Sequence, residues 1–169
     1  MAGRKTVNRR RKVHLPTQVA DMQMESCQML SKRIASLLEP RPEVLEAYLY
    51  GSHAQGRAQP HSDIDVAVYI DESIAEEGAF GYRAQLITEL MAGLHSNDID
   101  LLILNQAPPA LYYHVLRDGI RVQSRDLAET TTREGYAVSR YCDFAAHLAK
   151  IDERVAWAPC ESSRAQAPS

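Results

Sequence analysis

A Gly-Ser pair followed by an Asp-x-Asp motif constrains this chain more than any other feature of its sequence. Gly51 and Ser52 are followed, after a ten-residue spacer, by Asp63 and Asp65, and apolar runs typical of β-strands flank the whole segment. A glycine directly after a strand can adopt a backbone conformation closed to other residues, so that Ser52 begins a short helix whose free N–H groups attract phosphate oxygens. The pattern predicts a phosphate-binding turn between two strands.

Asp63 and Asp65 are two residues apart on the second predicted strand, so they project from the same face. Two carboxylates on one face repel each other unless a cation lies between them. We expect Mg²⁺, because it prefers oxygen ligands and is usually held by one or two carboxylates together with substrate phosphates, such as those of ATP. An isolated Asp-x-Asp is more often a turn with solvated carboxylates, but the ordered block of strand, Gly-Ser, spacer and Asp-x-Asp strand favours the metal site.

A third carboxylate lies in another predicted strand, which spans residues 97–104. Asp98 and Asp100 share a face of that strand. We expect Asp100 to be the functional residue, because it lies inside the apolar run, where an unpaired charge is penalised. Asp98 lies at the mouth of the strand and is also consistent with a simple turn residue.

Together, Gly51, Ser52, Asp63, Asp65 and Asp100 resemble the motif of the nucleotidyltransferase superfamily related to DNA polymerase beta, and above all its minimal nucleotidyltransferases (MNT). The resemblance covers roughly residues 43–122. It implies that the three aspartates are catalytic and bind metal, with the Asp-x-Asp pair holding Mg²⁺ on the triphosphate of ATP while the Gly-Ser pair cradles the outer phosphates. The third aspartate either binds a second metal or accepts the proton of the attacking hydroxyl.

The resemblance also implies a partner. MNT proteins are commonly the antitoxin of a pair whose toxin is a HEPN-domain ribonuclease, and they can transfer AMP from ATP to a tyrosine of that toxin. Two alternatives stay open, namely transfer to a small molecule such as an aminoglycoside and neutralisation of a toxin by binding alone. Arg140 and His147 match the short Arg-gap-His pattern of HEPN nucleases, but Ala149 replaces the tyrosine that often follows, so this chain is interpreted as the partner of the nuclease.

The sequence departs from the family pattern just after the Gly-Ser pair. Family members often carry basic residues there, whereas this chain has His53 and Gln55, so Arg57 is the only fixed cation of the predicted turn. Phosphate affinity or acceptor choice is therefore expected to differ. His53 and His61 are interpreted as exposed loop residues rather than phosphate ligands.

Alternating helices and strands predict an α/β (α+β) fold, in which a mixed nucleotidyltransferase sheet carries helices packed on it and a C-terminal helix. Helices are expected over residues 17–38, 76–94 and 108–117, and strands over residues 45–50, 64–70, 97–104 and 120–123. The predicted organisation is a disordered basic tail (1–16), a minimal nucleotidyltransferase domain (17–125), a C-terminal helix packed on that domain (126–158) and a disordered tail (159–169).

The charge of the chain is concentrated at its start. Six of the 19 Lys and Arg residues lie within residues 4–12, which leaves 13 against 22 Asp and Glu, a charge of −9, for the remainder. The basic tail is able to contact nucleic acid or an acidic partner, although a solvated end is the simpler interpretation. The three cysteines form no zinc motif, and no apolar run has the length of a membrane span. These features predict a soluble, cytoplasmic protein without a membrane partner.

Overall fold

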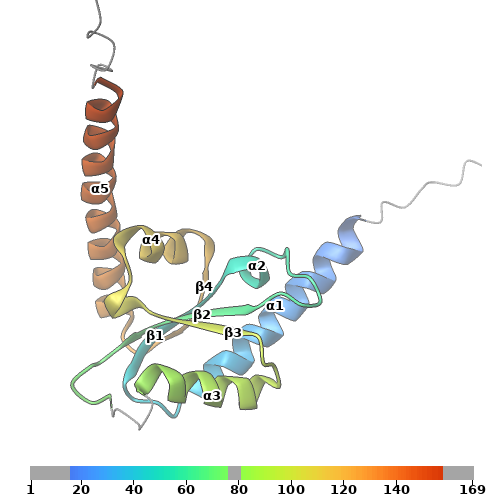
Figure 1. Cartoon of the computed structure of the whole chain (residues 1–169). Helices are drawn as coiled ribbons and strands as arrows, with labels where there is room; N and C mark the ends of the chain where they lie inside the picture. Colours follow the sequence, from blue (N-terminus) through green and yellow to red (C-terminus); the bar gives the residue numbers. More distant parts are fainter. Residues whose placement is uncertain (1–15, 76–80, 158–169) are drawn as a thin grey trace, which may run out of the picture.

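The computed structural model describes residues 16–75 and 81–157 and contains a four-stranded mixed sheet with helices on both faces (Figure 1). The predicted α/β fold is confirmed. The helices are α1 (Pro16–Leu38), α2 (Gly51–Ala54), α3 (Tyr82–Leu94), α4 (Pro109–Asp118) and α5 (Leu127–Trp157), with a 3-10 turn, η1 (Leu104–Gln106). The strands are β1 (Val44–Tyr50), β2 (Ile64–Ile70), β3 (Ile99–Ile103) and β4 (Ile120–Ser124).

The two predicted tails lie almost entirely outside the described residues, as do residues 76–80 at the start of one predicted helix. The described part of that helix, α3, begins at Tyr82, because Gly81 before it has a φ of 83°, which is incompatible with an α-helix. Cys27 and Cys142 are free thiols, whereas Cys160 lies outside the described residues. None of the helices in the described ranges combines the length and apolar character that a membrane span requires.

The strand order β3-β2-β1-β4 determines where the motif residues meet. β1 is antiparallel to β2 and β4, whereas β2 and β3 are parallel and are connected through α3. In this register Asp65 pairs with Tyr50 on one side and with Asp100 on the other. Two of the three predicted aspartates therefore lie side by side on neighbouring strands.

Each face of the sheet carries its own core, because alternate strand residues point to opposite sides. The larger core lies against α1 and α3 and includes Ile34, Leu38, Leu49, Val66, Leu86, Leu90 and Leu101. The smaller core, called here the second core, lies against α4 and α5 and consists of Tyr48, Ala67, Leu104, Ala107, Tyr112, Val115 and Ala137. Ala67 is two residues from Asp65 on β2, so the predicted site lies on the face of the second core.

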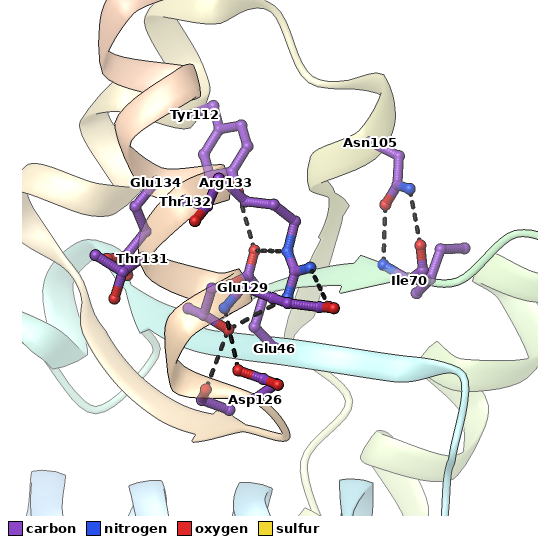
Figure 2. A network of polar contacts seen from close by, with 12 residues as sticks. Glu46, Ile70, Asn105, Tyr112, Asp126, Glu129, Thr131, Thr132, Arg133 and Glu134 are labelled. Carbon is purple, nitrogen blue, oxygen red and sulfur yellow. Dashed lines mark hydrogen bonds and ion pairs between the residues drawn. The ribbon is translucent and has the colours of Figure 1, made fainter.

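A buried carboxylate fastens α5 to this face (Figure 2). Glu46, in the middle of β1, is fully buried and accepts a hydrogen bond of 3.0 Å from the hydroxyl of Tyr112 on α4. Its Oε1 lies 3.5 Å from Nε of Arg133 on α5, which supplies the compensating charge. Burial and the nearby Glu46 carboxylate raise the pKa of Tyr112 well above its ordinary value, so this hydroxyl stays a proton donor. The sheet, α4 and α5 thus meet at one polar contact.

We expect an Arg133→Met variant to lose about 3 kcal/mol of the free energy of unfolding, because removal of one partner leaves the buried Glu46 charge uncompensated. Urea denaturation provides the measurement. Arg140→Met is the matched control, since Arg140 lies on the same helix in an exposed position. Equal stability of the two variants would contradict the role assigned to the Glu46–Arg133 pair.

The first residues of α5 pack on the domain and its second half projects away from it (Figure 1). The helix begins after Asp126, whose Oδ1 accepts hydrogen bonds from the N–H groups of Ala128 and Glu129 at 2.8 and 3.1 Å and so caps the free donors of the first turn. Tyr141 stacks on Tyr113 of α4, with 4.0 Å between the ring centroids. The prediction of a helix from residue 126 onward is thus matched by a helix that begins one residue later and contacts the domain over part of its length.

Candidate active site

The turn after β1 is built around Gly51, which has a φ of 68° and directly follows the last residue of the strand. A Cβ atom placed on Gly51 would lie 2.0 Å from Oδ2 of Asp65. Only glycine satisfies both the left-handed backbone and this close approach. The structure therefore brings the first element of the motif into direct contact with the second.

Helix α2 begins at Gly51 and continues through Ser52 and His53. The N–H of Arg57 donates a 2.9 Å hydrogen bond to the carbonyl of Ser52, which closes the turn. Nε2 of His53 lies 3.2 Å from the carbonyl oxygen of Ser62 and so ties α2 to the spacer before the Asp-x-Asp pair. The interpretation of His53 as an exposed loop residue is wrong, because it is a half-buried helical residue with this contact, whereas His61 is exposed in the spacer as expected.

The carboxylates create a negative potential at the end of the sheet. Partial burial, then the nearby Asp100 and Asp63, raise the pKa of Asp65 above its ordinary value, and only the His53 side chain opposes them. The pKa of Tyr50 rises to about 12, through burial first and then the charges of Asp100 and Asp65. A cation at this position would relieve both effects.

The carboxylate oxygens at this end of the sheet fit a hard divalent cation that also binds the phosphates of a substrate. Carboxylate oxygens are the ligands that Mg²⁺ prefers, and Mg²⁺ usually takes only one or two of them from protein. No three His, Cys, Asp or Glu side chains within residues 16–75 and 81–157 lie close enough together to hold a metal by themselves. The residues therefore suit a cation that arrives with, and is completed by, phosphate oxygens.

Asp100 has a partner that no sequence pattern indicated. Nη2 of Arg83, in the first turn of α3, lies 3.1 Å from Oδ1 of Asp100, and its Nε donates a 2.7 Å hydrogen bond to the carbonyl of Leu101. The side chain of Asp100 is 58% exposed because β3 is an edge strand. The penalty on an unpaired charge, which was the reason to favour Asp100 from the sequence, does not apply here, since the charge is both paired and solvated. Asp98 is exposed at the mouth of β3.

A cleft with a volume of about 370 Å³ begins at Asp100 and extends over η1 and α4. Its volume falls in the range of small-molecule sites, about 300–1,000 Å³. The cleft combines polar groups near the carboxylates with apolar walls further away. Its lining includes Tyr50, Arg83, Leu102, Gln106, Pro108 and Leu111.

An Asp65→Asn variant is expected to be more stable than the wild type at neutral pH without divalent metal. The raised pKa means that the folded state favours the protonated carboxyl, so this stabilisation is present below the pKa of the unfolded chain and is lost as pH rises through the folded pKa. Urea denaturation of both proteins at neutral pH and below about pH 4, the ordinary range of Asp, should show the difference only at neutral pH. A variant less stable than the wild type at neutral pH would contradict the electrostatic account.

A glycine turn beneath one carboxylate, with a second carboxylate opposite it on the neighbouring parallel strand, is an arrangement typical of nucleotidyltransferases. The comparison with known families agrees with this class. The chain belongs to the family described as Polymerase beta, Nucleotidyltransferase, which matches residues 32–128.

Individual relatives show which members of this family the chain is similar to. The protein adenylyltransferase MntA of Shewanella oneidensis is 32% identical over 93 residues, which are 54% of this chain and 63% of that protein. The matched segment thus spans less than two thirds of that curated relative. A crystal structure of a toxin-antitoxin with AMP-PNP is similar with a TM-score of 0.62 and 28% identity, over 74% of this chain and 97% of the other. A structure of a tri-AMPylated Shewanella oneidensis HEPN toxin in complex with an MNT antitoxin has a TM-score of 0.58 and 25% identity, over 76% and 98% of the two chains.

Proposed function

We propose that the chain is the antitoxin of a HEPN/MNT toxin-antitoxin pair and transfers AMP from ATP, with Mg²⁺, to a tyrosine of the HEPN ribonuclease toxin. The observation that carries the proposal is the position of Asp65, which touches Gly51 and faces Asp100 on the next strand. The names of the relatives supply the acceptor, since one is a protein adenylyltransferase and another is complexed with an AMPylated HEPN toxin. The proposal includes a cytoplasmic location, where ATP is available.

Each part of the site has a proposed task. Asp63 and Asp65 would hold Mg²⁺, which supplies charge neutralisation to the triphosphate. The turn of Gly51 and Ser52 binds the outer phosphates, and the cleft over η1 and α4 orients the remainder of the nucleotide and the acceptor. Residues 17–125 form the catalytic unit in this proposal, and α5 is an appended helix.

The transfer itself is an in-line displacement. The tyrosine oxygen forms a bond to the α-phosphorus, the bond from that phosphorus to the bridging oxygen of pyrophosphate breaks, and pyrophosphate leaves with the electron pair. Asp100 accepts the phenolic proton or, as the alternative, contributes to a second metal. Arg83 contacts Oδ1 of Asp100 and holds the carboxylate in place, so Oδ2 is the oxygen assigned to either task.

Intact-mass spectrometry tests this function. The purified chain is incubated with Mg²⁺, ATP and a candidate HEPN partner, and both proteins are weighed. AMP-sized additions to the HEPN protein support the proposal. An unmodified HEPN protein in a stable complex would replace it with neutralisation by contact, and the absence of any binding would favour a small-molecule acceptor.

A further inference from the structure

A second cleft lies on the same face of the sheet but apart from the carboxylates. It has a volume of about 340 Å³ and is formed where β2, η1, α4 and α5 meet. Its lining is rich in aromatic rings and guanidinium groups and includes Tyr69, Asn105, Tyr112, Arg133, Tyr136 and Arg140. None of these residues has a task in the proposed transfer reaction.

The second core separates this cleft from the catalytic residues. Tyr69 and Asp65 are four residues apart on β2, a distance of about 13 Å along a strand. Ala67 lies between them and is fully buried, and Val115 of α4, also fully buried, belongs to the same core. Because side chains fill the intervening face, the cleft is a site of its own rather than an extension of the one beside Asp100.

Two polar side chains in the floor of the cleft, Asn105 and Arg133, already have partners (Figure 2). The amide of Asn105 donates to the carbonyl of Ile70 at 2.8 Å and accepts from its N–H at 2.9 Å. Arg133 lies 5.1 Å from the centroid of the Tyr69 ring, and its charge is met by Glu46 and Glu129. These contacts hold the aromatic wall in place without offering a free charge.

Within the described part of the chain, Arg140 supplies an unpaired positive charge, which the floor of the cleft lacks. Its guanidinium lies 6.0 Å from the centroid of the Tyr136 ring, and both side chains are exposed at the rim. Among the described residues, no carboxylate forms an ion pair with Arg140, whereas Arg117 at a comparable 5.9 Å from Tyr113 is paired with Asp118. The cleft thus combines an aromatic slot with one uncompensated cation at its mouth.

We propose that this cleft binds an adenylate, with the base against the tyrosine rings and the phosphate at Arg140. Stacking on aromatic side chains accepts a nucleobase without any need for matched hydrogen bonds, and arginine pairs readily with phosphate. The volume of about 340 Å³ suits a single nucleotide. This second site goes beyond the proposed reaction and holds whether or not the acceptor is a toxin.

Equilibrium dialysis with AMP tests the proposal in the full-length Asp63→Ala, Asp65→Ala variant with EDTA, so that the catalytic site is disabled. One AMP per chain is expected to bind. Adding Arg140→Gln should weaken binding at least about tenfold, the effect of losing a single charge-assisted contact. Adding Arg117→Gln, which removes the matched arginine outside the cleft, should leave binding unchanged.

Two results would overturn the proposal, namely the absence of AMP binding by the double variant and equal losses in the two arginine variants. Adenosine tests the phosphate contact, since it should bind more weakly than AMP and should be insensitive to Arg140→Gln. The adenylate has two sources, the free nucleotide and the group carried by a modified tyrosine. Parallel titrations with ATP and with a short AMPylated tyrosine peptide distinguish the two sources. The compound that corresponds to the true source is expected to bind to the cleft at least as tightly as AMP.

Discussion

The Asp63→Ala, Asp65→Ala variant is expected to lose AMP transfer by at least about a thousandfold while it stays folded. The reason is that metal stabilisation of a phosphoryl-type transition state contributes several kcal/mol, and each 1.4 kcal/mol is about tenfold in rate. Asp63 is exposed and Asp65 is half-buried with a raised pKa, so their removal does not empty the core. Intact-mass spectrometry of the HEPN protein, with circular dichroism of the variant, provides the measurement.

Asp98→Asn is the matched control for this loss. Asp98 is also an exposed aspartate at the same end of the sheet, and its backbone carbonyl accepts a 2.9 Å hydrogen bond from the N–H of Ile64, which the substitution leaves in place. Its transfer rate should equal that of the wild type. Transfer that persists in the double aspartate variant would refute a metal role for the Asp-x-Asp pair.

The strands were predictable from local pattern, whereas the strand order and the register of the site were not. Alternating apolar residues within residues 45–50 and 64–70 correspond to β1 and β2. Asp63 lies directly before β2, and its charge contributes to the raised pKa of Asp65, so the two carboxylates are near each other. The direct pairing of Asp65 with Asp100 comes from the sheet register, in which β2 and β3 are parallel neighbours.

Contacts between distant segments were not predictable in the same way. Glu46 reads in the sequence as a polar residue of a half-exposed strand, yet it is fully buried because α4 brings Tyr112 and α5 brings Arg133 to it. Arg83 is one of several polar residues on α3, and only the packing of that helix on β3 places it against Asp100. Such partners depend on tertiary packing, for which a single sequence carries no periodic signal.

The structure also shows what surrounds the turn after the Gly-Ser pair, where this chain lacks the basic residues that family members often carry. Arg57, the one fixed cation of the turn, is exposed and donates a hydrogen bond to Gln55. The pKa of Asp118 on α4 is lowered first by its hydrogen bond from Arg117, and the charge of Arg57 is the smallest contribution. The turn therefore offers phosphate little positive charge of its own. In the proposed function, the triphosphate is held by backbone N–H groups and by a cation at the aspartates.

Gly51→Ala is expected to lower both stability and activity, and the comparison with Gly81→Ala separates the two causes. Gly51 and Gly81 both have a positive φ, 68° and 83°, so alanine at either position carries backbone strain of about 1–2 kcal/mol. At Gly51 the new Cβ meets an obstacle, since Oδ2 of Asp65 would lie 2.0 Å away, whereas at Gly81 no atom of the described residues, chain neighbours aside, lies within 4 Å.

The two variants should therefore lose similar stability in urea denaturation, with the larger loss at Gly51. Transfer activity should fall at least about a hundredfold in Gly51→Ala, because displacement of a metal-binding carboxylate by about 1 Å has effects of that size. It should stay near wild type in Gly81→Ala, whose strain is remote from Asp65. Because unfolding is measured separately, a Gly51→Ala protein that is folded but inactive assigns the loss to the site, that is, to the turn at Gly51 and the Asp65 carboxylate that it contacts. An active Gly51→Ala protein would show instead that the contact between the turn and the carboxylate is dispensable for transfer.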